Sequence, residues 1–121
     1  MLGKTICATV ALACLLTAAA NPKIAEAQAK VKAGKFTEAI AILEPIQASA
    51  GAEARTALAN AHLKYGDSFF LNEKLPPRQK YRPALVQYRN VLKYDKANKD
   101  ATTKIKLIES IYKQMGLPIP Q

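Results

Sequence analysis

The stretch GKFTEAIAIL (residues 34–43) has a longer counterpart in KYRPALVQYRNVLKYD (residues 80–95). The apolar positions of the two stretches correspond one to one: Phe36, Ala39, Ile40 and Leu43 match Tyr81, Ala84, Leu85 and Tyr88. Steps of three and one along the chain place such residues on one face of an α-helix. The internal repeat therefore predicts two amphipathic helices of the same kind in one chain.

Glycine and proline divide the chain after residue 22 into five predicted helices. We expect these helices at about residues 23–32, 35–44, 52–72, 81–94 and 101–115. Pro45 predicts a kink or an early end of the second helix, because proline has no backbone N–H to donate. Pro83 is expected in the first turn of the fourth helix, where a missing N–H does little harm. Gly116 is expected to cap the fifth helix, whose buried side would include Met115.

Both repeated stretches resemble the turn and second helix of a tetratricopeptide repeat (TPR) unit. The segment AEARTALANAHLKYGD (residues 52–67) resembles a first helix of the same family, with Leu58 and Ala59 in the place of its Leu-Gly pair. The resemblance covers nearly all of the chain after residue 21 and amounts to two and a half units. It implies an all-α fold, in which antiparallel helix pairs stack as a short right-handed solenoid closed by a C-terminal capping helix.

The spacing of the two units departs from the family pattern, because additional residues fall between Gly66 and Tyr81. Within residues 21–121, which we take as one TPR-like domain, we place an insertion at about residues 67–80. The insertion is expected to extend the third helix and then form a loop bounded by prolines. Phe69 and Phe70 would pack onto the neighbouring helices.

Residues 1–20 have the pattern of a secretory signal peptide. Lys4 is followed by sixteen uncharged residues, TICATVALACLLTAAA, which end in small side chains suited to cleavage after Ala20. The alternative is an uncleaved membrane anchor through residues 5–22, although this stretch is short for spanning a bilayer. Both readings predict an exported bacterial protein that is periplasmic or associated with the cell envelope.

The sequence contains no evident catalytic or metal-binding constellation. Cys7 and Cys14 both lie inside the predicted signal peptide, so the mature chain would contain no cysteine. His62 is the only histidine, and its position between Leu58 and Tyr65 on one helix face is typical of a packed residue. The glycines form no phosphate-binding loop. We therefore expect no catalytic residue, no cofactor, no metal site and no enzyme activity.

Positive charge is concentrated between residues 74 and 106, which hold ten basic and two acidic residues, whereas residues 23–73 hold six of each. Such asymmetry is typical of a surface that meets an anionic partner. Because exported proteins seldom meet nucleic acid, we expect an acidic protein or peptide, or an anionic membrane surface. The alternative is that these residues serve solubility alone. The predicted basic stripe consists of Arg82, Arg89, Lys93 and Lys96.

The resemblance to TPR proteins implies a second binding surface, a groove lined by the first helices of the units. In this sequence the groove residues would be Thr56, Asn60, Leu63 and Lys64. The leading hypothesis is a non-catalytic scaffold or adaptor in the cell envelope that binds a partner through the groove, the basic stripe or both. A second hypothesis is an accessory subunit of a larger membrane complex, held by an uncleaved N-terminal helix. A third is an envelope-polymer-binding protein or enzyme.

Overall fold

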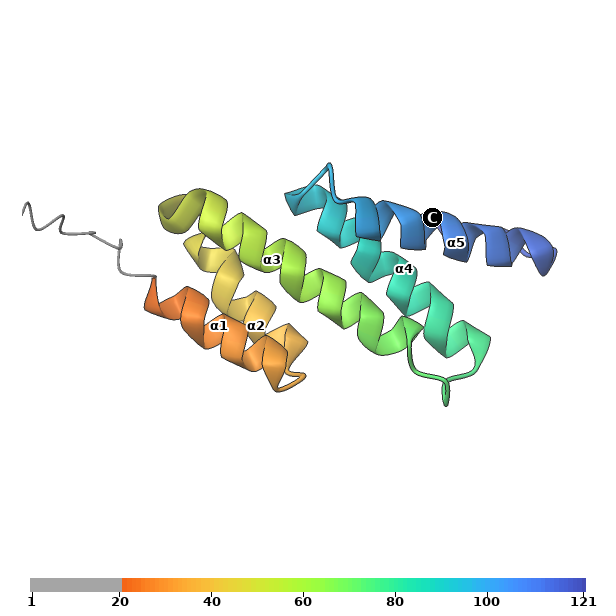
Figure 1. The fold of residues 1–121 in the computed structure, drawn as a ribbon, viewed down its shortest axis with the longest axis horizontal. Helices are drawn as coiled ribbons and strands as arrows, with labels where there is room; N and C mark the ends of the chain where they lie inside the picture. The colour runs from red at the N-terminus through yellow and green to blue at the C-terminus, as the bar shows by residue number, and fades with distance from the viewer. Residues whose placement is uncertain (1–20) are drawn as a thin grey trace, which may run out of the picture.

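The computed structural model describes residues 21–121, and this part of the chain is all-helical, as expected (Figure 1). Its elements are α1 (Pro22–Lys32), α2 (Phe36–Leu43), the 3-10 turn η1 (Glu44–Ile46), α3 (Gln47–Phe70), α4 (Pro77–Tyr94) and α5 (Lys99–Gln114). The predicted signal peptide or anchor lies outside the described residues. Among the helices that the structure describes, none has the length and apolar character needed to span a bilayer.

Local sequence signals set the ends of the first and last helices. The side chain of Asn21 caps α1, and that of Asn98 caps α5 by accepting a hydrogen bond from the N–H of Ala101 at 2.9 Å. Gly116 closes α5 with a φ of 68°, as predicted, and its N–H bonds back to the helix. Met115 was expected to be buried, but it is 48% exposed. That prediction was wrong because Met115 follows the last helical residue, where the chain already turns away.

The junction between α2 and α3 contains more helix than predicted. α2 ends at Leu43, as Pro45 suggested, and the chain tightens into the 3-10 turn η1. Helical structure then resumes at Gln47, five residues before the expected start. Gly51, with φ 51° and ψ −121°, breaks the regular geometry of α3 near its beginning. Glycine tolerates this conformation because it has no Cβ, so the predicted stop is a sharp bend inside the helix.

The segment predicted as an insertion, at about residues 67–80, is mostly helical. α3 continues to Phe70, residues 71–76 form the loop, and α4 begins at Pro77, four residues earlier than predicted. Proline favours the first position of a helix because its φ is already helical. Pro83 consequently lies inside α4 and not in its first turn, so that prediction was wrong. Phe69 and Phe70 both pack against the core, as expected.

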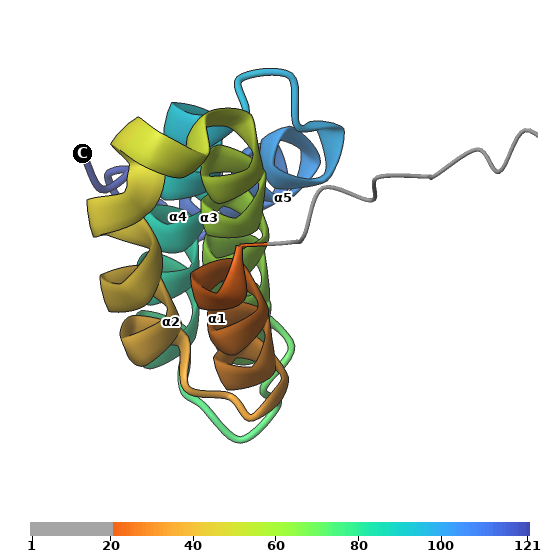
Figure 2. The same cartoon turned by 90° about the vertical axis from the view of Figure 1, so that its left-hand side faces the viewer.

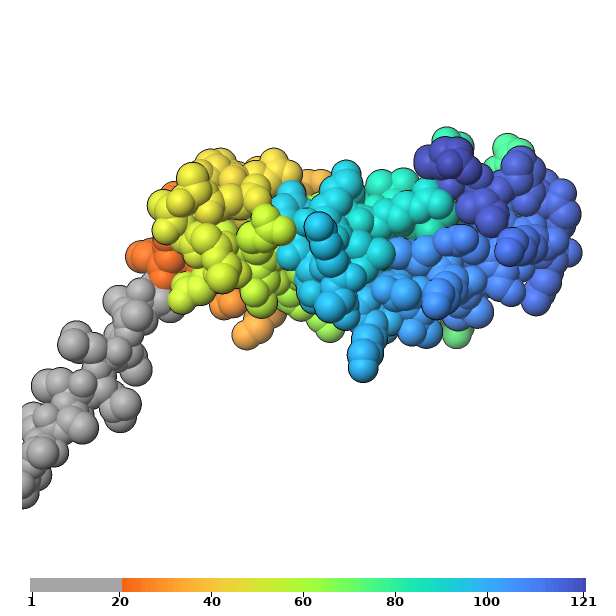
Figure 3. Space-filling model, turned by 90° about the horizontal axis from the view of Figure 1, so that it is seen from above, coloured from red at the N-terminus to blue at the C-terminus, as the bar shows by residue number. Residues whose placement is uncertain are grey.

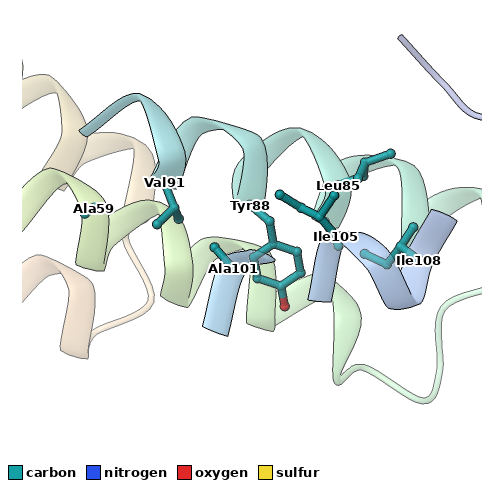
Figure 4. Packing of buried hydrophobic residues seen from close by; sticks show 8 residues of the cluster. Ala59, Leu85, Tyr88, Val91, Ala101, Ile105 and Ile108 are labelled. Carbon is teal, nitrogen blue, oxygen red and sulfur yellow. The ribbon is translucent and has the colours of Figure 1, made fainter. Parts of the chain in front are cut away.

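Each helix contacts the next one along the chain, and α1 also contacts α3. Seen from one end, α2 and α4 lie on one side of the molecule, and α1, α3 and α5 lie on the other (Figure 2). The helices enclose two groups of buried side chains that meet on α3. The N-terminal cluster consists of Ile24, Ala27, Ala39, Leu43, Ala57, Leu58 and Ala61. The C-terminal cluster consists of Ala59, Ala84, Leu85, Tyr88, Val91, Ala101, Ile105 and Ile108 (Figure 4).

A polar network anchors the C-terminal cluster. Tyr88 is fully buried, and its hydroxyl donates to Oδ1 of Asp67 at 2.6 Å. Nζ of Lys104 donates to the same oxygen at 2.6 Å and to Asp100 at 3.2 Å. Burial raises the pKa of Tyr88 well above its usual range, and the bond to Asp67 adds to this effect. Burial alone would lower the pKa of Lys104, but its bonds to the two carboxylates outweigh that effect and raise it. Tyr88 therefore stays a donor and Lys104 stays charged, so α3, α4 and α5 are held together.

Candidate interaction surfaces

An open groove runs between α1 and α3. It consists of two hollows of about 620 Å³ and 630 Å³. The first is lined by Ile24, Ala25, Gln28, Ala52, Glu53, Thr56, Ala57 and Asn60. The second is lined by Gln28, Val31, Lys32, Phe36, Asn60, Lys64, Asp67, Ser68 and Leu71. Because Gln28 and Asn60 belong to both, the two hollows form one continuous groove.

The structure places three of the four predicted groove residues in this groove. Thr56 and Asn60 line the first hollow, and Asn60 and Lys64 line the second; all three are exposed. Leu63 does not follow the prediction, because its half-buried side chain packs against the C-terminal cluster. Its place on α3, four residues after the buried Ala59, turns it towards that cluster. The stripe of Thr56, Asn60 and Lys64 instead advances in steps of four along the open side of the helix.

Sequence reasoning missed the α1 wall of the groove. Ile24, Gln28 and Val31 follow one another at steps of four and three, which was a usable signal for one helix face. Their side of α1 faces the groove in the structure.

The groove has an apolar floor, and its walls carry both polar and apolar side chains. Ile24 and Ala57 are buried beneath it, at 6% and 7% exposure. The side-chain amides of Gln28 and Asn60 form no hydrogen bond within residues 21–121, so their donors and acceptors are available to a ligand. Charged side chains stand further along the groove, with Glu53 in the first hollow and Lys32 and Lys64 in the second.

His62 is a packed residue, as the sequence indicated. The side chain is 6% exposed, and its ring stacks on that of Tyr94 with the ring centroids 5.6 Å apart. Its Nδ1 lies 2.8 Å from Oε1 of Gln87. Burial lowers the pKa of His62, although the hydrogen bond to Gln87 acts in the opposite direction. In the part of the chain that the structure describes, no three residues of the metal-ligating kinds considered (His, Cys, Asp and Glu) come together in a group that could hold a metal ion.

The predicted basic stripe is spread along α4 and the loop after it. Arg82, Lys93 and Lys96 are exposed, and Arg89 is half-buried. None of the four forms a salt bridge with a carboxylate of residues 21–121. Arg82 lies eleven residues before Lys93, which is about 16 Å along a helix. The structure therefore places the two ends of the stripe too far apart to hold one small anionic group.

Comparison of the chain with protein-family models, with curated proteins and with solved structures gave no match. The groove and the basic stripe are therefore the features from which we infer a function. Except for Lys96 and Leu71, their side chains belong to helices, which hold their positions better than side chains on loops would.

Proposed function

We propose that residues 21–121 form a TPR-like, non-catalytic interaction module. In this proposal α1 with α2 and α3 with α4 are two antiparallel helix pairs stacked as a short right-handed solenoid, and α5 is the capping helix. The contact between α1 and α3 supports this, because stacked pairs must touch between their first helices. Alanines at the packed positions, among them Ala27, Ala57 and Ala61, allow the helices to approach closely.

The groove between α1 and α3 is the observation that carries the proposal. Along α3 it extends from Ala52 to Ser68, sixteen residues and about 24 Å of helix. An extended peptide rises about 3.3 Å per residue, so the groove has room for about seven residues. This length and the open shape suit a peptide segment of a protein partner.

The side chains of the groove suit an extended backbone with an acidic end. The amides of Gln28 and Asn60 each offer a donor and an acceptor, which is the pairing that a peptide group requires. Lys32 and Lys64 provide positive charge in the second hollow, whereas Asp67 in the same hollow already accepts from Tyr88 and Lys104. An acidic residue of the partner would therefore lie near the two lysines and away from Glu53.

We place this module in the bacterial cell envelope, on the evidence of the signal-peptide pattern in residues 1–20. The protein would act there as a scaffold or adaptor. The basic stripe of Arg82, Arg89, Lys93 and Lys96 would add a second, salt-sensitive contact with an acidic partner surface.

A peptide selection followed by two matched variants tests this function. Peptides of eight random residues would be selected on the immobilised full chain, and their affinities measured by calorimetry. Asn60→Arg fills the middle of the groove, whereas Thr103→Arg adds the same side chain on the exposed side of α5. Both sites are exposed, so both variants are expected to fold.

We expect Asn60→Arg to weaken binding by on the order of tenfold or more, because it displaces the peptide from both hollows. Thr103→Arg should bind as the parent does. Selected peptides that are rich in acidic residues and that bind both variants equally well would show that the groove is not the binding surface.

A further inference from the structure

A third hollow, of about 470 Å³, lies between the beginning of α4 and the segment after α5. It is lined by Arg78, Arg82, Tyr112, Leu117, Pro118, Ile119 and Pro120, and we call it the C-terminal hollow. Figure 3 shows the last residues of the chain over the end of the molecule where α4 begins. The groove between α1 and α3 shares no residue with this hollow.

The C-terminal wall of the hollow is set by the way α5 ends. The N–H of Gly116 donates to the carbonyl of Lys113, and the N–H of Leu117 donates to that of Tyr112, both at 3.0 Å. This pair of backbone hydrogen bonds is a Schellman motif, which reverses the chain direction after a helix. Pro118 and Pro120 then restrict the segment that follows. The apolar residues of this wall are therefore held in place by backbone geometry.

The opposite wall carries two arginines without an anionic partner. Arg78 and Arg82 are four residues apart on α4, so their guanidinium groups project from the same face one turn apart. Within residues 21–121 neither forms a salt bridge or a side-chain hydrogen bond, and no acidic residue lines the hollow. Two like charges at this spacing repel each other, and a bound anion would relieve that repulsion. A separation of about 6 Å along the helix allows both to reach one phosphate or carboxylate.

We propose that the C-terminal hollow binds an anionic amphiphile, a molecule with one phosphate or carboxylate head on an apolar chain. Arg78 and Arg82 hold the head through charge-assisted hydrogen bonds. The apolar chain lies against Leu117, Pro118 and Ile119. A volume of 470 Å³ is within the range of small-molecule sites and is larger than a phosphate ion alone would need. The site goes beyond the proposed function, which uses Arg82 only for a contact with a partner surface and assigns no ligand to this hollow.

Calorimetry on the full chain with dodecyl phosphate below its micelle concentration tests the proposal. Arg78→Gln/Arg82→Gln should weaken binding by on the order of tenfold, because both head contacts are lost. Leu117→Ser should weaken the binding of dodecyl phosphate and leave that of inorganic phosphate unchanged. Lys99→Gln/Lys106→Gln is the matched control, since it removes two exposed positive charges outside both the hollow and the basic stripe. Circular dichroism would confirm that each variant is folded.

Two further ligands separate the head from the chain. Inorganic phosphate should bind more weakly than dodecyl phosphate, and dodecyl maltoside, with a neutral head, should not compete. The proposal is overturned if the arginine variant binds dodecyl phosphate as the parent does, if the lysine control loses as much affinity, or if inorganic phosphate binds as tightly as the amphiphile.

Flotation with vesicles identifies the natural source of the amphiphile. Phosphatidylcholine vesicles with and without phosphatidic acid would be compared for the parent and the arginine variant. Binding that requires both phosphatidic acid and the arginines assigns the ligand to a membrane lipid. Binding of free dodecyl phosphate without vesicle binding assigns it to a diffusible amphiphile. Both results support the hollow as the site.

Discussion

The N-terminal and C-terminal clusters share α3 but are built from different side chains. The buried residues of the N-terminal cluster are all aliphatic, and four of the seven are alanines. The C-terminal cluster is centred on the fully buried Tyr88 and is bordered by Phe69, Phe70 and Tyr81. Only the second has a polar network, from Tyr88 through Asp67 to Lys104.

This difference bears on where we propose that the molecule binds a partner. Small side chains bring α1 close to α3 and leave a groove open to solvent on their outer side. Large rings and a shared carboxylate fix α3, α4 and α5 against one another. We infer that the C-terminal cluster supplies the rigidity and that the N-terminal half supplies the groove.

The largest expected effect on the free energy of unfolding comes from removing the ring of Tyr88. Tyr88→Ala removes a fully buried ring and should lower the free energy of unfolding by about 3 to 5 kcal/mol. Leu43→Ala, at the equally buried centre of the N-terminal cluster, should cost about 2 to 5 kcal/mol. Urea unfolding followed by circular dichroism measures both. A clearly larger loss of unfolding free energy for Leu43→Ala would contradict the assignment of the rigid part of the molecule to the C-terminal cluster.

A smaller loss of unfolding free energy is expected from a change at Gly66, where α3 contacts the ring of Tyr88. A Cβ added at Gly66 would lie 2.6 Å from Cε1 of Tyr88, well inside van der Waals contact. Overpacking of this kind typically costs about 1 to 3 kcal/mol, which should exceed the gain of about 1 kcal/mol from replacing a helical glycine by alanine. Gly66→Ala should therefore lower the unfolding midpoint. The double variant with Tyr88→Leu should remove most of this penalty, and strict additivity of the two changes would rule out the contact as its cause.

The polar network of Asp67, Tyr88 and Lys104 should contribute to the free energy of unfolding by an amount similar to, or smaller than, the loss expected for Gly66→Ala. Asp67→Asn keeps the shape of the side chain but removes the negative charge of the carboxylate that accepts from Tyr88 and Lys104. The free energy of unfolding is therefore expected to fall by about 1 to 3 kcal/mol. Glu38→Gln is the matched control, because its ion pair with Lys30 is at the surface. Equal unfolding midpoints for the two variants would contradict the role assigned to the network.

The helix faces were predictable from the sequence, whereas the junctions were not. The apolar spacing of Tyr81, Ala84, Leu85 and Tyr88 indicated the side of α4 that faces the core, and three of these four residues are fully buried. The start of α4 depends on the loop after Phe70, and Pro77, which was predicted only to bound that loop, is the first residue of the helix. The polar network joins Asp67 to Lys104, which lies 37 positions further along the chain. No local spacing in the sequence predicts such a contact.

The candidate surfaces were predictable to a similar degree. The resemblance to TPR units predicted one wall of the groove, and Thr56, Asn60 and Lys64 line it because their steps of four place them on one face of α3. The α1 wall and the C-terminal hollow required the packing of separate helices. Arg82 illustrates the limit, since its sequence spacing grouped it with Arg89 and the fold grouped it with Arg78.

The smallest expected effect is a pH dependence that comes from His62. Burial lowers its pKa below the value of about 6.5 expected in the unfolded chain. The unfolded state therefore binds more protons below pH 6.5, so the stability present above that pH is lost as the pH falls towards the folded pKa. Because His62 is the only histidine, the urea midpoint should be lower at pH 5.5 than at pH 7.5, and less so in His62→Phe. An identical pH dependence in that variant would exclude His62 as the source.

Nuclear magnetic resonance tests most directly whether the groove between α1 and α3 is the binding surface. Side-chain amide signals of the ¹⁵N-labelled chain would be followed during titration with a peptide selected on the protein. We expect the signals of Gln28 and Asn60 to shift, while that of Gln79, on the exposed side of α4, stays in place. A shift of Gln79 together with unchanged signals of Gln28 and Asn60 would contradict the groove as the binding surface.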